Sequence, residues 1–473
     1  MDDDATDNHP ETDPQAGEDH AVVLGAGMAG LLAARVLARR FPRVTLIERD
    51  ELTGGGPELR SGIPQSRHAH ILWSRGMRLM EQMLPGVTAT LVEAGASLLE
   101  TPRDFLWLSP ADWFQSVPGT KVLIAGRDLL DWTVREEVLR DGRIRILGGA
   151  AATGLVAGPD GRSVAGVQLR DAAPLAARLV VDATGRTSKA TAWLAALGYP
   201  APAVTRYDPH LGYSSRYFEM PADPERRWHG MYVQSRPDLP RGGVLVPQGK
   251  DRWLVTLIGN GEHAPPVKDE EFFAFARSLR SPALYDAIRD ATPLSQATAF
   301  RSTVNEWRHY ERLERWPAGL VVLGDAACRF NPVYGHGMTV AALAVEALAK
   351  EIRTLDPEQI AAASRRIQRS TTAAAAVPWQ IATSEDMRYA VTEGPPPDRA
   401  TRILQNYMSR VMVGANADPV ISGRFFGVLS LTASPNTLLS PATMIRVLSK
   451  WRLPTAPDTA DYPAHYRPAG DRA

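Results

Sequence analysis

Cysteine is nearly absent from this chain. Cys328 is the only one among 473 residues, which excludes an internal disulfide and any cysteine-rich metal cluster. A chain so poor in thiols fits a reducing, cytoplasmic location, and we expect the protein to work there. No companion histidine motif supports Cys328 as a nucleophile, so we interpret it as a packing residue.

An excess of charge of either sign is also absent. Lysine and arginine total 53, and aspartate and glutamate total 53, so no overall basic field attracts nucleic acid or an anionic membrane. No uncharged run reaches the roughly 18 residues typical of a membrane-spanning helix. We therefore expect no nucleic-acid partner and no membrane insertion. A small-molecule task is favoured, and the oligomeric state stays open.

Apolar residues are scarce at the N-terminus. Residues 1–19 are acidic, the opposite of a signal peptide and typical of a disordered tail. The chain that follows is long enough for roughly two to three domains of about 150 residues each. Folding is expected to begin near Ala21.

The remaining chain has an α/β pattern interrupted by a change of texture. Residues 20–200 open with "AVVLGAGMAGLLAARVLARRFPRVTLIERD", which predicts a strand, a glycine turn, a helix and a second strand of a parallel sheet. From 144 to 172, short apolar runs alternate with turn residues and predict an inserted antiparallel meander. We predict a second, mostly antiparallel domain over 201–310, a return to the first sheet over 311–355, and a helical region over 356–473.

The glycine turn carries the first chemical motif. In "GAGMAG", Gly25 allows the tight turn, Gly27 lets the backbone approach a pyrophosphate, and Gly30 lets the helix pack closely on the strand. The helix N-terminus supplies free N–H groups to phosphates. Glu48 ends the second strand about 20 residues later, where an acidic side chain can hold ribose hydroxyls. A structural turn and a solvated carboxylate are the alternatives.

Two further strands also end in acid and glycine motifs. "VVDATGR" places Asp182 and Gly185 after one strand, and "GDAACRFNPVYGHGM" places Asp325 after another, with Gly335 and Gly337 at the start of a helix. Strand ends of one parallel sheet converge on one crevice. A single NAD unit needs only the first motif, whereas FAD has a ribityl chain and a flavin ring that the others can contact. The set predicts an FAD site.

These motifs, together with Arg127 in "GRDLLDWTVREEV", resemble those of the FAD-dependent monooxygenases of the para-hydroxybenzoate hydroxylase fold. The resemblance implies a Rossmann-like FAD-binding domain with an inserted antiparallel substrate domain and a C-terminal helical region. It implies that FAD is reduced by NAD(P)H and transfers oxygen through a flavin hydroperoxide. The implied FAD contacts are Gly25, Gly27, Gly30, Glu48, Arg49, Arg127, Asp325, Gly335, Gly337 and Met338, with Pro332 and Gly335 near the ring.

Two segments carry a narrower resemblance. "PQSRHAHILWSRGMRLMEQMLPG" and "ANADPVISGRFFGVLSLTASPNTLL" are similar to segments of actinobacterial epoxidases that make polyethers of the lasalocid and monensin type. That resemblance implies epoxidation of an apolar polyene polyketide in antibiotic biosynthesis. A flavin-dependent hydroxylase of an aromatic product and a reductase of isoprenoid double bonds are the alternatives, and a non-enzymatic flavin protein is the third class. The Trp-x-Trp-x-Ile-Pro segment of flavin halogenases is missing around Trp253.

Other candidate residues give a weaker functional signal. His68 and His70 form an H-x-H pair, but no third ligand has metal-site spacing, so we predict no metal and prefer packing or contacts to FAD phosphates. The second domain offers aromatic residues as pocket walls or ordinary sheet core: Tyr213, Phe218, Tyr232 and Phe300. No Ser-His-Asp or paired-carboxylate set is visible, which fits alkene epoxidation because that reaction needs no protein base.

Overall fold

The computed structural model describes residues 19–52, 55–223, 226–301, 303–450 and 462. The predicted disordered tail over 1–19 lies outside the described residues except for Asp19. The last part of the predicted helical region, after 450, also lies outside them except for Tyr462.

A parallel sheet forms the centre of the first half of the molecule. Its strand order among the described residues is β19-β11-β1-β2-β7, and every neighbouring pair is parallel. β1, β11 and β19 are adjacent, so the three motif-bearing strand ends meet at one edge, as the sequence predicts. The strands are β1 (His20–Leu24), β2 (Arg43–Ile47), β7 (Ile144–Leu147), β11 (Leu179–Asp182) and β19 (Leu320–Val322).

Both faces of this sheet are buried, and successive residues of β1 serve opposite faces. Val23 packs on one side against the helices α1 (Met28–Leu37), α4 (Arg127–Leu139) and α8 (Gly337–Ile352). Leu24 packs on the other side against α5 (Ala190–Ala196) and a small antiparallel sheet. Burial on both faces explains the continuous apolar runs of a parallel sheet. The small sheet contains β8 (Ala152–Ala157), β9 (Val164–Leu169) and β10 (Ala172–Ala176).

The predicted meander is correct for these three strands and wrong for the segment before them. Ile144 to Leu147 form β7, which pairs in parallel with β2, with Val44 opposite Ile144 and Ile47 opposite Leu147. Pairing there satisfies the backbone groups at the open edge of β2. An edge strand of the parallel sheet and a strand of the antiparallel meander are both short and apolar. Periodicity alone therefore did not distinguish the two at residues 144–147.

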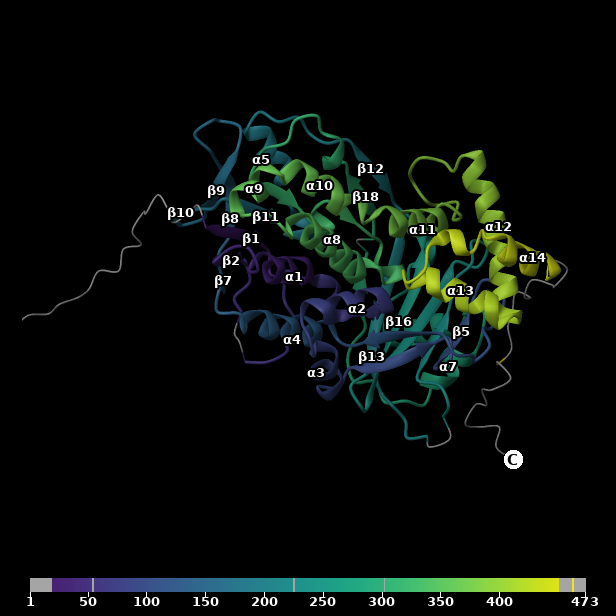
Figure 1. The fold of residues 1–473 in the computed structure, drawn as a ribbon. Coiled ribbons are helices and arrows are strands. Elements are labelled where there is room, and N and C mark those ends of the chain that lie inside the picture. The colour runs from purple at the N-terminus through teal and green to yellow at the C-terminus, as the bar shows by residue number, and fades with distance from the viewer. Residues whose placement is uncertain (1–18, 53–54, 224–225, 302, 451–461, 463–473) are drawn as a thin grey trace, which may run out of the picture.

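A second, mostly antiparallel sheet lies beside the first half (Figure 1). Its order is β17-β13-β16-β15-β14-β5 among the described residues, and only β14 and β5 pair in parallel. One face packs against α6 (Asp269–Arg277) and α7 (Ala283–Ile288). The strands are β5 (Phe105–Leu108), β13 (Leu211–Glu219), β14 (Gly230–Val233), β15 (Arg241–Gln248), β16 (Arg252–Asn260) and β17 (Thr298–Phe300).

Two small sheets join the halves. One contains β3 (Ile71–Trp73), β6 (Thr120–Ile124) and β4 (Ser97–Thr101), next to the helices α2 (Ser74–Met83) and α3 (Val87–Glu93). The other contains β12 (Val204–Tyr207), β18 (Asn305–Arg308) and β20 (Cys328–Arg329). The predicted domain boundaries stay a prediction. β5 lies within 20–200 but pairs with β14 of the second sheet, so these boundaries along the chain do not coincide with the division between the two large sheets.

Helices make up the chain after 356, and Figure 1 shows the last three gathered over one side of the second sheet. α12 and α13 pack there against Trp107, Val246 and Leu254 of β5, β15 and β16. The predicted fold class is therefore confirmed. None of the helices in the described part of the chain combines the length and apolar character needed to cross a membrane. The helices are α9 (Pro357–Ala362), α10 (Ser364–Ala373), α11 (Ala376–Asp386), α12 (Arg399–Ala417), α13 (Pro419–Leu429) and α14 (Pro441–Ser449).

Candidate active site

A cavity of about 1310 Å³ lies where the strand ends of the parallel sheet face the second sheet and the C-terminal helices. Ligand pockets usually measure about 300–1,000 Å³, so this one exceeds the room that a single drug-sized ligand needs. Of the FAD contacts that the family resemblance implies, all except Gly30 line it, together with Pro332. These are Gly25, Gly27, Glu48, Arg49, Arg127, Asp325, Pro332, Gly335, Gly337 and Met338.

The three glycines of the first turn meet three different demands. Gly25 has a φ of +91°, in the region that favours glycine. A Cβ on Gly30 would lie 1.9 Å from the Gly25 carbonyl oxygen, so Gly30 permits the close contact of α1 with the turn. A Cβ on Gly27 would meet no atom of the described residues within 4 Å. Gly27 borders open cavity space, as an approaching pyrophosphate requires.

Glu48 is buried, 5% exposed, and tied to the glycine turn. One carboxylate oxygen accepts a hydrogen bond from the Ala26 N–H at 2.8 Å and pairs with the Arg60 guanidinium. Arg60 also donates to the Ala26 carbonyl at 2.8 Å. The sequence contains no local signal for Arg60, which was missed. Its Nε lies 3.5 Å from the Asp50 carboxylate, so Arg60 is paired with two acids, Glu48 and Asp50, while it lines the cavity.

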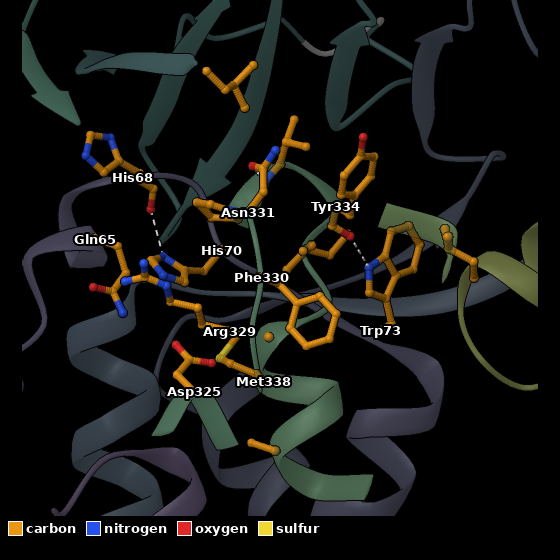
Figure 2. A pocket seen from close by; sticks show the side chains of 18 of the residues that line it. Gln65, His68, His70, Trp73, Asp325, Arg329, Phe330, Asn331, Tyr334 and Met338 are labelled. Carbon is orange, nitrogen blue, oxygen red and sulfur yellow. Dashed lines mark hydrogen bonds between the residues drawn. The ribbon is translucent and has the colours of Figure 1, made fainter. Parts of the chain in front are cut away.

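Asp325 lies among cations. Burial raises the pKa of its carboxyl group, and the guanidinium groups of Arg127, Arg329 and Arg186 oppose that rise. Figure 2 shows Asp325 and Arg329 with Met338 at the lower end of the cavity view. Arg127 is held by Asp131, with Nε 2.8 Å from the Asp131 carboxylate. Arg186 ends the "VVDATGR" stretch and Arg329 lies within "GDAACRFNPVYGHGM", but sequence reasoning assigned neither of them a role.

The turn over 331–335 and the start of α8 form the next part of the wall. Gly335 has a φ of +64°, and a Cβ there would lie 2.3 Å from Ile71 Cγ2. The turn geometry and the contact with Ile71 therefore account for a glycine at position 335. Gly337 differs, because a Cβ there would meet no described atom within 4 Å. The Trp73 indole donates to the Tyr334 carbonyl at 3.0 Å (Figure 2).

Asp182 does not reach the cavity. Its buried carboxylate accepts hydrogen bonds from the Thr184 N–H, the Thr184 hydroxyl and the Ser188 hydroxyl. Asp182 therefore shapes the turn after β11. The backbone that it holds, from Ala183 to Gly185, lines the cavity instead.

Asp386, the last residue of α11, is a further cavity-lining residue that carries no sequence signal. It is 2% exposed. Its carboxylate accepts hydrogen bonds from Tyr334 Oη at 2.7 Å and from Asn305 Nδ2 at 2.5 Å, with Asn331 Nδ2 at 3.3 Å. Burial raises its pKa to about 6, although these hydrogen bonds act in the opposite direction.

The cavity has two chemically different halves. The polar half is lined by Glu48, Arg49, Arg60, Arg127, Thr184, Arg186, Asp325 and Arg329. The apolar half is lined by Trp107, Tyr232, Val244, Val246, Ile381, Met408, Met412, Phe425, Leu429 and Leu438, all members of one hydrophobic cluster. Trp73 belongs to the same hydrophobic cluster and donates to the Tyr334 carbonyl, so it joins the 331–335 turn to the apolar half.

The predicted wall aromatics and Cys328 lie in different surroundings. Of the four predicted wall aromatics, Tyr213, Tyr232 and Phe300 line the cavity. Phe218 does not, because it packs against Phe272 of α6 on the other face of the sheet. Cys328 is buried in β20, and burial raises the pKa of its thiol.

The two histidines of the H-x-H pair also line the cavity, and other groups already hold one nitrogen of each. His68 Nδ1 lies 2.7 Å from the Ser215 hydroxyl, and His70 Nδ1 lies 2.8 Å from the His68 carbonyl (Figure 2). Burial lowers the pKa of His68 to about 4 and that of His70 to about 3. Within the described residues, no group of three or more His, Cys, Asp or Glu side chains is arranged to hold a metal ion.

These features decide which ligand the polar half suits. A helix N-terminus with an uncrowded Gly27, the cations Arg60 and Arg127, and an acid at a neighbouring strand end together suit a dinucleotide. A sequence model described as "FAD binding domain" matches residues 18–385. The chain belongs to this FAD binding domain family. FAD is therefore its cofactor, and the residues of the polar half fit it.

Individual proteins are similar to this chain in sequence or in fold. Protein Rv3254 of Mycobacterium tuberculosis is 29% identical over 435 residues, covering 88% of this chain and 90% of that protein. PqsL of Pseudomonas aeruginosa, described as "a probable FAD-dependent monooxygenase", aligns with a TM-score of 0.59 at 19% identity over 78% of this chain and 97% of PqsL. The flavin-dependent brominase Bmp2 aligns with a TM-score of 0.62 at 14% identity over 91% and 99%. These structures support the hydroxybenzoate hydroxylase-like fold for this FAD-binding chain.

Proposed function

We propose that the chain is a flavin monooxygenase that epoxidises an alkene of an apolar, polyketide-like substrate. The overall reaction consumes the alkene, O2, NAD(P)H and one proton, and yields the epoxide, NAD(P)+ and water. One oxygen atom enters the substrate and the other leaves as water. The two electrons of NAD(P)H balance the second atom. The narrower similarity to polyether epoxidases belongs to this proposal.

FAD, when bound, supplies the redox chemistry that activates O2 and delivers one oxygen atom. The chain's own residues bind and orient. We assign the pyrophosphate to the backbone at Gly25 and Gly27, and the ribose to Glu48. We assign the ribityl chain to Asp325, and the side of the ring to Gly337 and Met338. Arg60 and Arg127 provide positive charge for the phosphates.

The apolar half of the cavity is the observation that carries the substrate assignment. Its residues come from the second sheet, α11, α12, α13 and the segment after α13, and their side chains are aliphatic, methionine and aromatic. Polar residues of the same helices, such as Ser384 and Ser409, also line the cavity. Methionine side chains adapt to irregular apolar shapes. A long hydrocarbon ligand fits such walls, because burial contributes about 25 cal/mol per Å² of apolar surface. The same walls exclude water from the place of oxygen transfer.

An aromatic hydroxylase is the second candidate, and Asp386 is the observation that favours it. A hydroxylase benefits from a base that deprotonates a phenol, and Asp386 is a cavity-lining carboxylate with a pKa near 6. However, donors from Asn305, Asn331 and Tyr334 already occupy this carboxylate. We therefore prefer epoxidation, in which no substrate proton has to be removed.

Product analysis tests the proposal. The purified chain is loaded with FAD and supplied with NADPH, O2 and a linear polyene, and the products are analysed by mass spectrometry and NMR. We expect a gain of one oxygen atom with loss of an alkene. A gain of oxygen on an aromatic ring would establish the hydroxylase. Product that forms equally well without O2, with a gain of two hydrogens, would establish a double-bond reductase and refute the proposal.

A further inference from the structure

The 331–335 turn is held by side chains that lie far away in the sequence. Asn331 accepts a hydrogen bond from the Val333 N–H at 3.0 Å and one from the Tyr213 hydroxyl at 3.1 Å. Its own N–H donates to Asn305 Oδ1 at 2.7 Å. These contacts join the turn to β13 and β18.

Asp386 is the hub of this arrangement. Asn305, Asn331 and Tyr334 all donate to its carboxylate, which as an ionised acid only accepts hydrogen bonds. Two of these donors belong to the turn, and the third holds the Asn331 N–H. Asp386 lies one residue beyond the segment that matches the family, 18–385.

We propose that Asp386 is a positioning residue that fixes the 331–335 turn between the cofactor and substrate halves of the cavity. It would hold the backbone beside Gly335 and Gly337 at one distance from the bound flavin, and would tie that backbone to α11, which carries Ile381 of the apolar half. The inference rests on the proposed function for its purpose, because oxygen transfer needs a fixed distance between flavin and alkene.

The ionised carboxylate is maintained at a cost to the fold. Because burial raises the pKa of Asp386 from 3.8 to about 6, the native state binds its proton more tightly than the unfolded state. The contribution of this group to stability therefore falls as pH rises from about 4 to about 6 and is constant above. A charge retained under that cost, with two of its three donors supplied by the turn itself, indicates a role in placing the turn.

Other titratable groups surround Asp386. Glu385 on the same helix raises the pKa of Asp386 further and is itself paired with Arg388 at 3.0 Å. Tyr334, Tyr213 and Tyr389 face it from the turn, from β13 and from the segment after α11. Burial raises the pKa of each tyrosine above its ordinary value, so these hydroxyls stay neutral between pH 5 and 8.

Hydrogen exchange measured by mass spectrometry tests the role without relying on catalysis. In the FAD-free chain, D386N leaves at least one of the amide donors without an acceptor, so we expect the amides of the 331–335 turn to exchange about tenfold faster. The matched control is Y389F, which removes a nearby buried hydroxyl bonded to Ser235 at 2.8 Å. Turn exchange in Y389F should equal that of the wild type. Equal turn exchange in D386N and the wild type would overturn the proposal.

The visible spectrum of bound FAD provides the second measurement. In the wild type, we expect a pH-dependent spectral change with a midpoint near 6, and in D386N no such change. If D386N does not fold, Y334F replaces it. That variant keeps the carboxylate and removes a hydrogen bond that lowers its pKa, so the midpoint should move upward.

A midpoint that persists in D386N, or stays fixed in Y334F, would contradict the inference. A merely structural Asp386 would lower the melting temperature without either signature. These outcomes differ from failure of the proposed function, which would appear as a folded chain with a normal FAD spectrum and no oxygenated product.

Discussion

The two halves of the cavity are built from different kinds of sequence. The polar half comes from residues that follow strands within a few positions, such as Gly25 and Gly27 after β1 or Asp325 after β19. The apolar half is assembled from strands and helices between Trp107 and Leu438. The polar half serves FAD binding, which the whole family shares. The apolar half is not covered completely by the family match, because α12 and α13 lie outside the matched residues 18–385.

The largest expected effect separates packing from ligand binding within one turn. In Gly30→Ala, a methyl group would overlap the Gly25 carbonyl, with only 1.9 Å between the atoms. We expect a loss of about 3 kcal/mol or more in the free energy of unfolding, measured by urea denaturation of the FAD-free chain.

Gly27→Ala is the matched control. Its methyl group would enter open space, and Gly27 has a φ of −83° that any residue adopts. We expect its free energy of unfolding to stay within about 0.5 kcal/mol of the wild type, while FAD affinity falls. Equal destabilisation by the two substitutions would refute the different roles given to these glycines.

The next effect concerns Asp325, the acid of the polar half. Asp325→Ala removes a carboxylate that we assign to the ribityl chain, and a hydrogen bond to a charged group contributes about 1.5–3 kcal/mol. FAD affinity should fall by roughly 10- to 100-fold, as titration of the apoprotein followed by flavin fluorescence would measure. The fold should stay intact, because burial of this carboxylate raises its pKa and so works against the charged form. Wild-type affinity would contradict the assignment.

A smaller effect, on the pH dependence of stability, is expected where the start of α8 contacts α13. His336 is buried, with Nε2 2.8 Å from the Leu429 carbonyl of α13, and burial lowers its pKa from 6.5 to about 4. The unfolded state therefore binds the proton more tightly. The stability that neutral His336 provides is complete above pH 6.5 and is lost as pH falls toward 4.

At pH 5 the loss at His336 amounts to about 2 kcal/mol. His336→Gln keeps a donor and does not titrate. Thermal melts of the two proteins between pH 5 and 8 should therefore show a shallower pH dependence for the variant. Parallel melting curves would show that His336 does not titrate in this way.

The smallest effect on FAD is expected from the apolar half. Met412→Trp narrows this half, so turnover of a long polyene should fall while FAD affinity stays within about twofold of the wild type. Met444→Trp on α14 is the control, because Met444 is 41% exposed and lies on the surface. A parallel loss of FAD affinity in Met412→Trp would show that the two halves do not bind separate ligands.

The sequence predicted the parts of the site that depend on local backbone conformation. Glycine turns and strand-end acids are visible in short stretches, so the parallel sheet and the lining residues from Gly25 to Met338 were predictable. Arg60 and Asp386 were not, because each reaches the cavity from a segment without a motif. Arg186 was given no role, although it ends the "VVDATGR" stretch. Phe218 and Phe300 look alike in sequence, and only the faces of β13 and β17 separate a core residue from a wall residue.

The helical region shows the same limit. Its helices were predictable from periodicity, but the three-dimensional packing of Met408, Met412 and Phe425 over the second sheet was not. Contacts of this kind join residues hundreds of positions apart, such as Trp107 and Phe426 at a ring distance of 5.2 Å. A single sequence carries no pairing signal for them.

The central claim is that FAD occupies the polar half and leaves the apolar half for the substrate. Titration of the purified apoprotein with FAD, followed by visible absorption, tests this claim most directly when wild type, Asp325→Ala and Met412→Trp are compared. We predict one FAD per chain in the wild type, weakened binding in Asp325→Ala, and unchanged binding in Met412→Trp. A folded chain that stays colourless with added FAD, or a Met412→Trp variant weakened as much as Asp325→Ala, would contradict the account.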